Sequence, residues 1–302
     1  MNLVWSPKYQ VDLPGHIFPV VKYRLTQEVA LEKAIVSRED LVEAPRAARE
    51  DLLLAHTPEY IDDLVNLRWT HRTQRSEMAL TREIVEAYIY SAGGTIEAAG
   101  LALEGGVCVH IGGGFHHAYP DHAEGFCYVN DVGVAIRRLR RDGLAQRVAV
   151  IDCDLHQGNG TAYMFRDEPD VFTFSIHQED NYPLKEKSDL DIGLPDGAGD
   201  SLYLEELEAV HEILDGHGPE IVFYLAGADP YVGDQLGGLA LTVEGLRRRD
   251  RVVFDACAAR GIPVAVVLAG GYAVDVMDDV DIHVGTILEA SRYNPERGEP
   301  EA

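Results

Sequence analysis

The sequence predicts a single α/β domain with a mainly parallel central sheet flanked by helices. Short apolar segments alternate with longer helical stretches, which indicates successive strand–helix–strand units. The 302 residues contain no internal repeat and no segment resembling an interdomain linker. Several apolar segments end in glycine-rich polar runs, which is typical of the carboxyl edge of a parallel sheet.

The expected strands are seven short apolar runs, at residues 3–5, 52–55, 107–111, 148–151, 171–174, 221–225 and 264–268. Five of them lead into polar segments, which read GGGFHH, DCDLH, SIH, AGAD and AGGY. Because the carboxyl ends of parallel strands lie along one edge, we expect these five segments to converge on one site.

Helices are expected at residues 58–67, 81–104, 131–142, 202–214 and 243–260. Thr57 and Thr242 are the expected N-caps of the first and last, and Pro58 suits a first helical position. We expect residues 1–293 to form one catalytic domain and residues 294–302, NPERGEPEA, to form a loose acidic tail.

The formal charge of −25, from 51 acidic and 26 basic residues, argues against a nucleic-acid partner, since phosphate binding needs a basic face. The charge either keeps the protein soluble or attracts cationic substrates. No apolar run is long enough to span a membrane and no secretion signal is visible. The four cysteines form no C-x-x-C pair, so we expect free thiols and a cytoplasmic protein.

Asp154 and His156 lie two residues apart at an expected strand end, where extended backbone points both side chains the same way. Asp229, from another strand end, adds a third ligand. Three protein ligands with one open position are the usual arrangement of a catalytic zinc. An Asp-x-His alone is more often a turn or capping feature, and the other strand ends favour the metal site.

The adjacent His116 and His117 follow three glycines, which let the chain pass close to a ligand. After a strand and a glycine turn, general acid–base catalysis is the better interpretation of such a pair. Phe126, in the segment GFCYVND, is either part of the core or the wall of an apolar channel.

The segments GGGFHH, GFCYVND, DCDLHQGNGT, FSIH, GADPYVGDQLGG and LAGGY, in this order, resemble the zinc-dependent histone deacetylases of the arginase–deacetylase fold. The resemblance covers most of the chain, from Pro14 to about Tyr272. Two further segments, PGHIFPVVKYRL and NYPLKEKSDLDIGLPDG, look most like the class IV branch, which has bacterial members.

The resemblance implies a role for each matching position. Asp154, His156 and Asp229 match zinc ligands, and His116 and His117 match the catalytic pair, with Asp152 supporting His116. Tyr272 matches the tyrosine that polarises the scissile carbonyl. The resemblance also implies an acyl channel and a structural potassium ion. The channel residues are Gly125, Phe126, Tyr182 and Leu236, and the potassium ligands are Asp152, Ser175 and backbone carbonyls at Asp154, His156 and Ile176.

Two departures from the family pattern concern the substrate. Asn159 stands where the best-known branch has an aspartate supporting the second histidine, so His117 should be less basic. No residue of the segment 68–82 matches the acidic rim residue of other members. Arg24 matches an arginine of the channel below the zinc.

The resemblance therefore implies a hydrolase that removes acetyl or longer acyl groups from the ε-amine of lysine in proteins or peptides. The alternative within the family is a deacetylase of small acetylated amines such as acetylpolyamines. An arginase-like enzyme with two metal ions lacks the further aspartates it would need. An acyl-lysine reader without catalysis is the third alternative.

Overall fold

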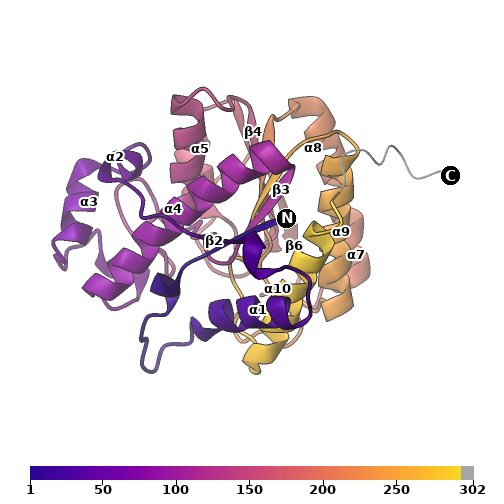
Figure 1. Ribbon diagram of the computed structural model, residues 1–302, viewed down its shortest axis with the longest axis horizontal. Helices are drawn as coiled ribbons and strands as arrows, with labels where there is room; N and C mark the ends of the chain where they lie inside the picture. Colours follow the sequence, from indigo (N-terminus) through magenta and orange to yellow (C-terminus); the bar gives the residue numbers. More distant parts are fainter. Residues whose placement is uncertain (294–302) are drawn as a thin grey trace.

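Eight strands form one parallel sheet in the order β2-β1-β3-β8-β7-β4-β5-β6 in the computed structural model, which describes residues 1–293 (Figure 1). This confirms the predicted α/β architecture with a parallel sheet. The strands are β1 (Asn2–Trp5), β2 (Leu41–Glu43), β3 (Val107–His110), β4 (Val148–Asp152), β5 (Val171–Gln178), β6 (Leu190–Leu194), β7 (Ile221–Leu225) and β8 (Val264–Val267).

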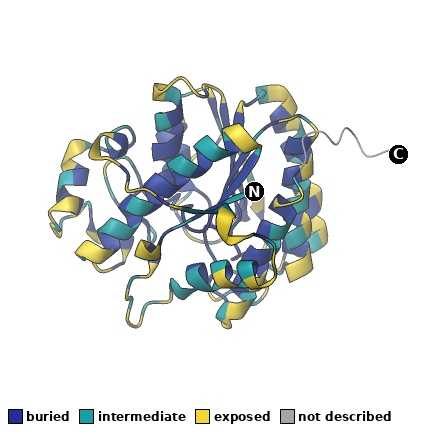
Figure 2. Cartoon of the chain, in the orientation of Figure 1, coloured by how far each residue is buried: buried dark blue, intermediate teal, exposed yellow. Residues whose placement is uncertain are grey.

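The middle of the sheet is the core of the molecule. Strands β3, β4, β7 and β8 are buried along their whole length, and their residues are mostly apolar on both faces. Such runs are typical of parallel strands that helices cover on both sides. The edge strands β2 and β6 are only partly buried, whereas the dark blue of the central strands in Figure 2 marks them as buried.

Helices cover both faces of the sheet. One layer contains α2 (Arg49–Leu52), α3 (Pro58–Val65), α4 (Arg82–Gly105), α5 (Asp131–Arg141) and α6 (Asn159–Phe165). The other contains α1 (Val21–Glu32), α7 (Asp200–Leu207), α8 (Ala209–His217), α9 (Val243–Ala258) and α10 (Val276–Ala290).

The predicted helix starts are largely confirmed. Thr81 Oγ1 accepts a hydrogen bond from the Ile84 amide at 3.3 Å, and Thr242 Oγ1 accepts one from Gly245 at 2.9 Å. Thr57 occupies the N-cap of α3 without a side-chain capping bond. The single helix expected over residues 202–214 is instead two helices, α7 and α8, which meet at Glu208.

One predicted strand is wrong. Residues 52–55 are the end of α2 and the turn that follows it. Leu52 and Ala55 are buried whereas Leu53 and Leu54 are partly exposed, and this spacing of three is helical. Strand β5 extends through Gln178, so Ser175 and Ile176 lie inside it and not after it.

The elements missing from the prediction are β2, β6, α1, α2, α6 and α10. The edge strand β2 has only three residues and none is fully buried. In α1 the buried residues include Lys22 and Thr26, so no clear apolar stripe marks the helix.

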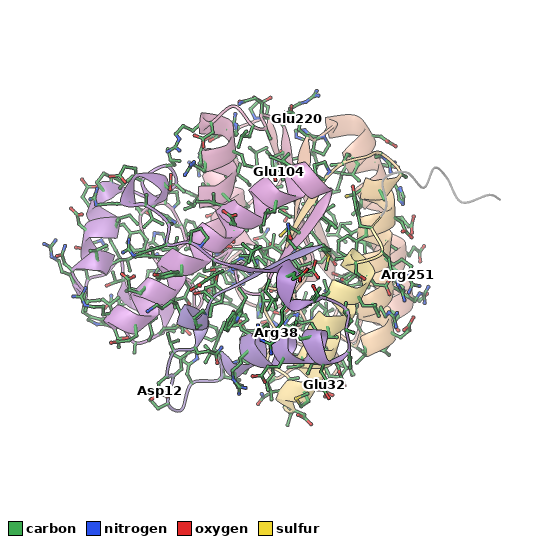
Figure 3. All side chains as sticks on the ribbon, in the orientation of Figure 1. Asp12, Glu32, Arg38, Glu104, Glu220 and Arg251 are labelled. Atoms are coloured by element: carbon green, nitrogen blue, oxygen red, sulfur yellow. The ribbon has the colours of Figure 1, made fainter. Side chains whose placement is uncertain are left out.

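Of the charged residues labelled in Figure 3, Asp12, Glu32, Arg38, Glu104 and Glu220 are exposed and Arg251 is half-buried. All four cysteines are buried and free, as predicted. None of the helices within residues 1–293 combines the length and the hydropathy that a membrane crossing requires. The predicted C-terminal tail, residues 294–302, lies outside the described residues.

Candidate active site

The three predicted metal ligands converge at the carboxyl edge of the sheet. Asp154 and His156 follow β4, and Asp229 follows the neighbouring strand β7. All three are buried, and their ligand atoms lie within 4.8 Å of one another. His156 Nδ1 is 3.3 Å from Asp154 Oδ1 and 3.2 Å from Asp229 Oδ2. Within residues 1–293 no second group of three such side chains converges in this way.

The chemistry of this cluster fits a divalent cation. Burial and the charge of Asp154 raise the pKa of Asp229 to about 7. Burial lowers the pKa of His156, but the two carboxylates outweigh it and raise that pKa to about 10. The two buried carboxylates and the imidazole therefore keep protons unless a cation supplies the positive charge in their place. An Asp2His donor set with an open position is suited to a catalytic zinc.

Backbone amides fix the two carboxylates. Asp154 Oδ2 accepts a hydrogen bond from the Gly270 amide at 2.9 Å, and Asp229 Oδ1 accepts one from Leu155 at 3.0 Å. Gly270 lies so close that an added Cβ would stand 2.2 Å from Asp229 Oδ2. The glycine after β8 is therefore required for the approach of the backbone to the cluster.

His116 and His117 lie beside the cluster with different partners. His116 Nδ1 is 2.7 Å from Asp152 Oδ2, and His117 Nδ1 is 2.7 Å from Asn159 Oδ1. The two Nε2 atoms are 3.2 Å apart. Burial lowers the pKa of His116, but Asp152 and Asp154 outweigh it and raise the pKa to about 9. Burial and the charge of His116 hold the pKa of His117 well below its usual range.

The loop that carries this pair is anchored from α5. The Asp131 carboxylate accepts hydrogen bonds from the amides of Gly114 at 3.0 Å and Phe115 at 2.8 Å. The pair is therefore positioned by a buried carboxylate at the start of α5, a helix that packs against α4.

Tyr272 follows β8 and lines the same inner pocket as His116, His117, Asp154 and His156. Its amide donates to Asp234 Oδ2 at 2.7 Å. The preceding loop is held by the fully buried Lys22, whose Nζ donates to the carbonyls of Ala269 at 3.1 Å and Gly271 at 3.2 Å.

The prediction that Arg24 reaches the channel below the metal is wrong. Arg24 is exposed on α1, where it pairs with Glu28 at 2.7 Å. Lys22 occupies the interior position instead, because residues two apart on a helix point to different faces. No local pattern indicates a buried lysine at this position, since its hydrogen-bond partners are 247 and 249 positions away along the chain.

A mouth of about 280 Å³ leads to the inner pocket. The four predicted channel residues, Gly125, Phe126, Tyr182 and Leu236, all line it. Gly125 has a φ of +48°, and an added Cβ would stand 2.6 Å from Tyr182 Oη and 2.7 Å from His117 Cδ2. Side-chain bulk at this position would therefore narrow the channel.

Glu77 also lines the mouth. It belongs to the arginine-rich segment 68–82, in which the sequence comparison found no acidic rim residue. Glu77 has a left-handed backbone, with a φ of 62°. This turn is not recognisable from the local sequence, so the position of the carboxylate at the mouth was not predicted.

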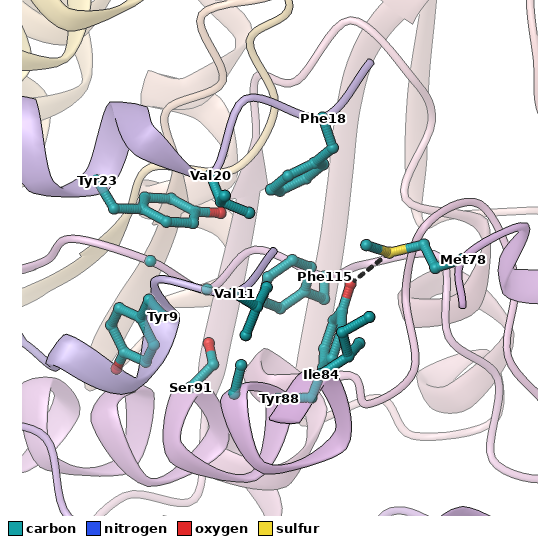
Figure 4. A pocket seen from close by; sticks show the side chains of 13 residues that line it. Tyr9, Val11, Phe18, Val20, Tyr23, Met78, Ile84, Tyr88, Ser91 and Phe115 are labelled. Atoms are coloured by element: carbon teal, nitrogen blue, oxygen red, sulfur yellow. Dashed lines mark hydrogen bonds between the residues drawn. The ribbon is translucent and has the colours of Figure 1, made fainter. Parts of the chain in front are cut away.

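A second chamber adjoins the inner pocket, with which it shares Phe18, Gly113 and Phe115, and Figure 4 shows its lining. Its volume is about 30 Å³, room for roughly two water molecules. The walls are mostly aromatic and aliphatic. Two hydroxyls in the wall, Tyr23 Oη and Ser91 Oγ, are buried and have no hydrogen-bond partner among the described residues.

Comparison with known proteins identifies the family. The model of the histone deacetylase domain matches residues 16–287. The chain belongs to the histone deacetylase family. It is 42% identical over 285 residues to an uncharacterized protein of Picosynechococcus, covering 93% of this chain and 95% of the relative. It is 29% identical over 292 residues to histone deacetylase 2 of Arabidopsis thaliana, covering 90% of this chain and 74% of that protein.

The fold agrees with this assignment. The crystal structure of a histone deacetylase homologue complexed with SAHA superimposes with a TM-score of 0.86 at 25% identity, covering 97% of this chain and 84% of that chain. The chain is thus a hydrolase of the deacetylase family, and its buried Asp154, His156 and Asp229 form a metal site typical of zinc deacetylases.

Proposed function

We propose that this histone deacetylase family member hydrolyses the amide between an acyl group and the ε-amine of lysine in proteins or peptides. The observation that carries the proposal is the inner pocket, where the metal cluster, the histidine pair and Tyr272 meet at the end of a channel. We assign the metal to zinc and the chain to the class IV branch. The segments PGHIFPVVKYRL and NYPLKEKSDLDIGLPDG support the class IV assignment.

The residues divide the chemistry among them. Zinc held by Asp154, His156 and Asp229 would polarise the amide oxygen and lower the pKa of water. A histidine of the pair accepts the proton of the attacking water. The Tyr272 hydroxyl donates a hydrogen bond to the carbonyl oxygen as negative charge develops there.

The leaving group explains the need for a second proton transfer. The lysine ammonium has a pKa of about 10.4, and the neutral amine is a far weaker acid still, so the nitrogen does not depart as an anion. A protonated histidine of the pair must deliver a proton to the nitrogen. His116 and His117, with pKa values shifted in opposite directions, are suited to separate charged and neutral roles.

The mouth and the chamber support the proposed substrate. The channel between Phe126 and Tyr182 suits the apolar stem of lysine, and the Glu77 carboxylate can accept a hydrogen bond from the substrate backbone. The chamber behind Phe18 and Phe115 provides space next to the site for acyl groups longer than acetyl.

We also propose a structural potassium ion bound by Asp152, Ser175 and the carbonyls of Asp154, His156 and Ile176. The register of the sheet supports it, because Asp152 of β4 pairs directly with Ser175 of β5. Flame or mass-spectrometric analysis of the dialysed protein for potassium tests this assignment, and a protein that retains none refutes it.

A hydrolysis panel tests the proposed function. It crosses acetyl, butyryl and octanoyl groups with a lysine peptide, free lysine and spermidine, using zinc-loaded protein. We expect amine release from the peptide that stops with a chelator and returns with zinc. No release from any substrate, with zinc bound, contradicts the proposal. Release from acetylspermidine alone establishes the polyamine alternative, and binding of acyl-lysine without turnover establishes the reader.

A further inference from the structure

Asn159, which replaces the aspartate of the best-known branch, has a charged neighbour. Its Nδ2 donates to Glu124 Oε1 at 3.4 Å and to the Tyr119 hydroxyl at 3.2 Å. Asn159 is fully buried at the start of α6, and Glu124 is only 9% exposed on the loop just before the channel residue Gly125. A carboxylate thus stands behind the amide that contacts the second histidine.

Glu124 is held in its ionised state. Burial raises its pKa, but hydrogen bonds and charges from His122 and Arg75 outweigh it and bring the pKa below the usual value. Arg75 Nη2 forms an ion pair with Glu124 Oε2, and His122 Nε2 lies 3.6 Å from the same oxygen. The other carboxylate oxygen, Oε1, faces Asn159.

An ionised carboxylate only accepts hydrogen bonds, so it fixes the orientation of the amide. Asn159 must turn Nδ2 toward Glu124, and its Oδ1 then faces His117 Nδ1 at 2.7 Å. The Gly160 amide donates to the same Oδ1 at 3.0 Å, which agrees with this orientation. Because Oδ1 has no proton to give, His117 must carry its own proton on Nδ1.

We propose that Glu124 is a positioning residue for the second histidine, acting through the amide of Asn159. It holds His117 in the tautomer with a proton on Nδ1, so that Nε2 presents its lone pair to the inner pocket. This inference rests on the proposed function for its kinetic consequence, but the tautomer itself does not depend on it.

The relay also supplies charge that the amide lacks. When His117 accepts a proton it becomes a cation, and a neutral amide alone stabilises that cation less than a carboxylate would. The negative charge of Glu124 lies on the side of the Asn159 amide that faces away from His117. It polarises the N–H and C=O of the amide so that the oxygen facing His117 becomes more negative. The departure at Asn159 is thereby compensated by Glu124.

The first experiment measures the tautomer. Long-range ¹H–¹⁵N spectra of zinc-loaded protein labelled with ¹⁵N-histidine distinguish protonation at Nδ1 from protonation at Nε2, and the His117→Gln variant assigns the signal. We expect the Nδ1–H form in the wild type and a mixture of forms in Glu124→Leu. A wild-type His117 protonated on Nε2, or an unchanged pure Nδ1–H form in Glu124→Leu, overturns the proposal.

The second experiment measures kcat and KM for an acyl-lysine peptide. General acid–base catalysis contributes about 10²–10⁴-fold, and we expect Glu124→Leu, which leaves His117 in place, to lower kcat by roughly 10-fold or more with little change in KM. Glu124→Gln, which keeps an acceptor of the same shape but no charge, should lose less and retain the Nδ1–H tautomer. If Glu124→Leu folds poorly, the kcat of Glu124→Gln is measured in its place.

In the Asn159→Asp background, we expect the removal of the Glu124 charge to raise kcat and not to lower it. An aspartate needs no orienting partner and is repelled by Glu124, so adding Glu124→Gln to it should raise kcat. Glu289, a buried glutamate of α10 paired with Arg247 and Arg251 of α9, is the matched control. Glu289→Leu should lower stability and leave the His117 tautomer unchanged.

An equal loss from removing Glu124 in both backgrounds would mean a merely structural role and would refute the relay. If the wild type hydrolyses nothing, the proposed function fails while the tautomer spectrum still decides the positioning of His117.

Discussion

Replacing Tyr272 with phenylalanine isolates the contribution of one hydroxyl. The ring packs near Phe18 at 5.8 Å and Phe126 at 6.0 Å between centroids, and Lys22 Nζ lies 5.6 Å from its centre. A phenylalanine ring keeps all three contacts. The backbone hydrogen bond from residue 272 to Asp234 also remains. We therefore expect Tyr272→Phe to fold and to bind zinc like the wild type.

The expected cost falls on turnover. Burial, together with the negative charge of Asp154 and Asp229, raises the pKa of Tyr272 well above its usual value. The hydroxyl therefore keeps its proton at neutral pH and acts as a hydrogen-bond donor. Loss of one such donor to a developing oxyanion costs about 10²–10³ in kcat, or ~2.7–4 kcal/mol in the barrier.

The assay compares kcat, KM, zinc content and Tm for the wild type and Tyr272→Phe on an acyl-lysine peptide. Tyr293→Phe is the control, because its hydroxyl donates to the Ile262 carbonyl away from the site. A Tyr272→Phe variant that keeps full kcat would refute the assigned role. A loss of kcat that accompanies loss of zinc would also refute it, since the hydroxyl would then act through the fold.

Three further predictions concern the channel, the pH dependence of stability and the metal. Gly125→Ala should lower kcat/KM at least tenfold without loss of zinc, since its Cβ would meet Tyr182 Oη at 2.6 Å, whereas Gly100→Ala, in open space on α4, should not. Burial lowers the pKa of His56 to about 4, so between that value and about 6.5 the unfolded chain binds a proton that the folded chain excludes. The free energy of unfolding should therefore decrease as the pH is lowered, by ~1.4 kcal/mol per pH unit and ~3 kcal/mol in all. Urea unfolding at pH 7 and pH 4.5 should show a smaller decrease for His56→Gln than for the wild type. Chelation should lower the Tm of the wild type, because a ligand bound 1,000-fold above its Kd adds about 4 kcal/mol, and should leave the Tm of Asp229→Ala unchanged.

The sequence predicted the features that depend on local patterns of residues. The central strands, such as β4 and β7, are apolar on both faces and were recognised from that composition. The metal ligands were recognised because the Asp154–His156 spacing and Asp229 both follow such strands. In contrast, the helix α1 and the edge strand β2 have no clear apolar period, and their place in the fold depends on what packs against them.

The residues that the sequence did not reveal act over long distances along the chain. Lys22 contacts carbonyls near position 270, and Glu124 contacts Asn159, which is 35 positions away. Glu77 reaches the mouth through a left-handed turn in a segment dominated by arginines. The periodicity of the sequence does not predict such contacts, because the partner of each side chain is brought close only in the folded structure.

The geometry of the cluster of Asp154, His156 and Asp229 depends on the surrounding loops more than on its own residues. Both carboxylates are oriented by backbone amides, those of Gly270 and Leu155, and each amide belongs to a segment that follows a different strand of the sheet. Lys22 in turn holds the carbonyls on either side of Gly270. A shift of the loop after β8 would therefore move Tyr272 and a metal ligand's hydrogen bond together. The buried lysine couples the geometry of the oxyanion donor to that of the metal site.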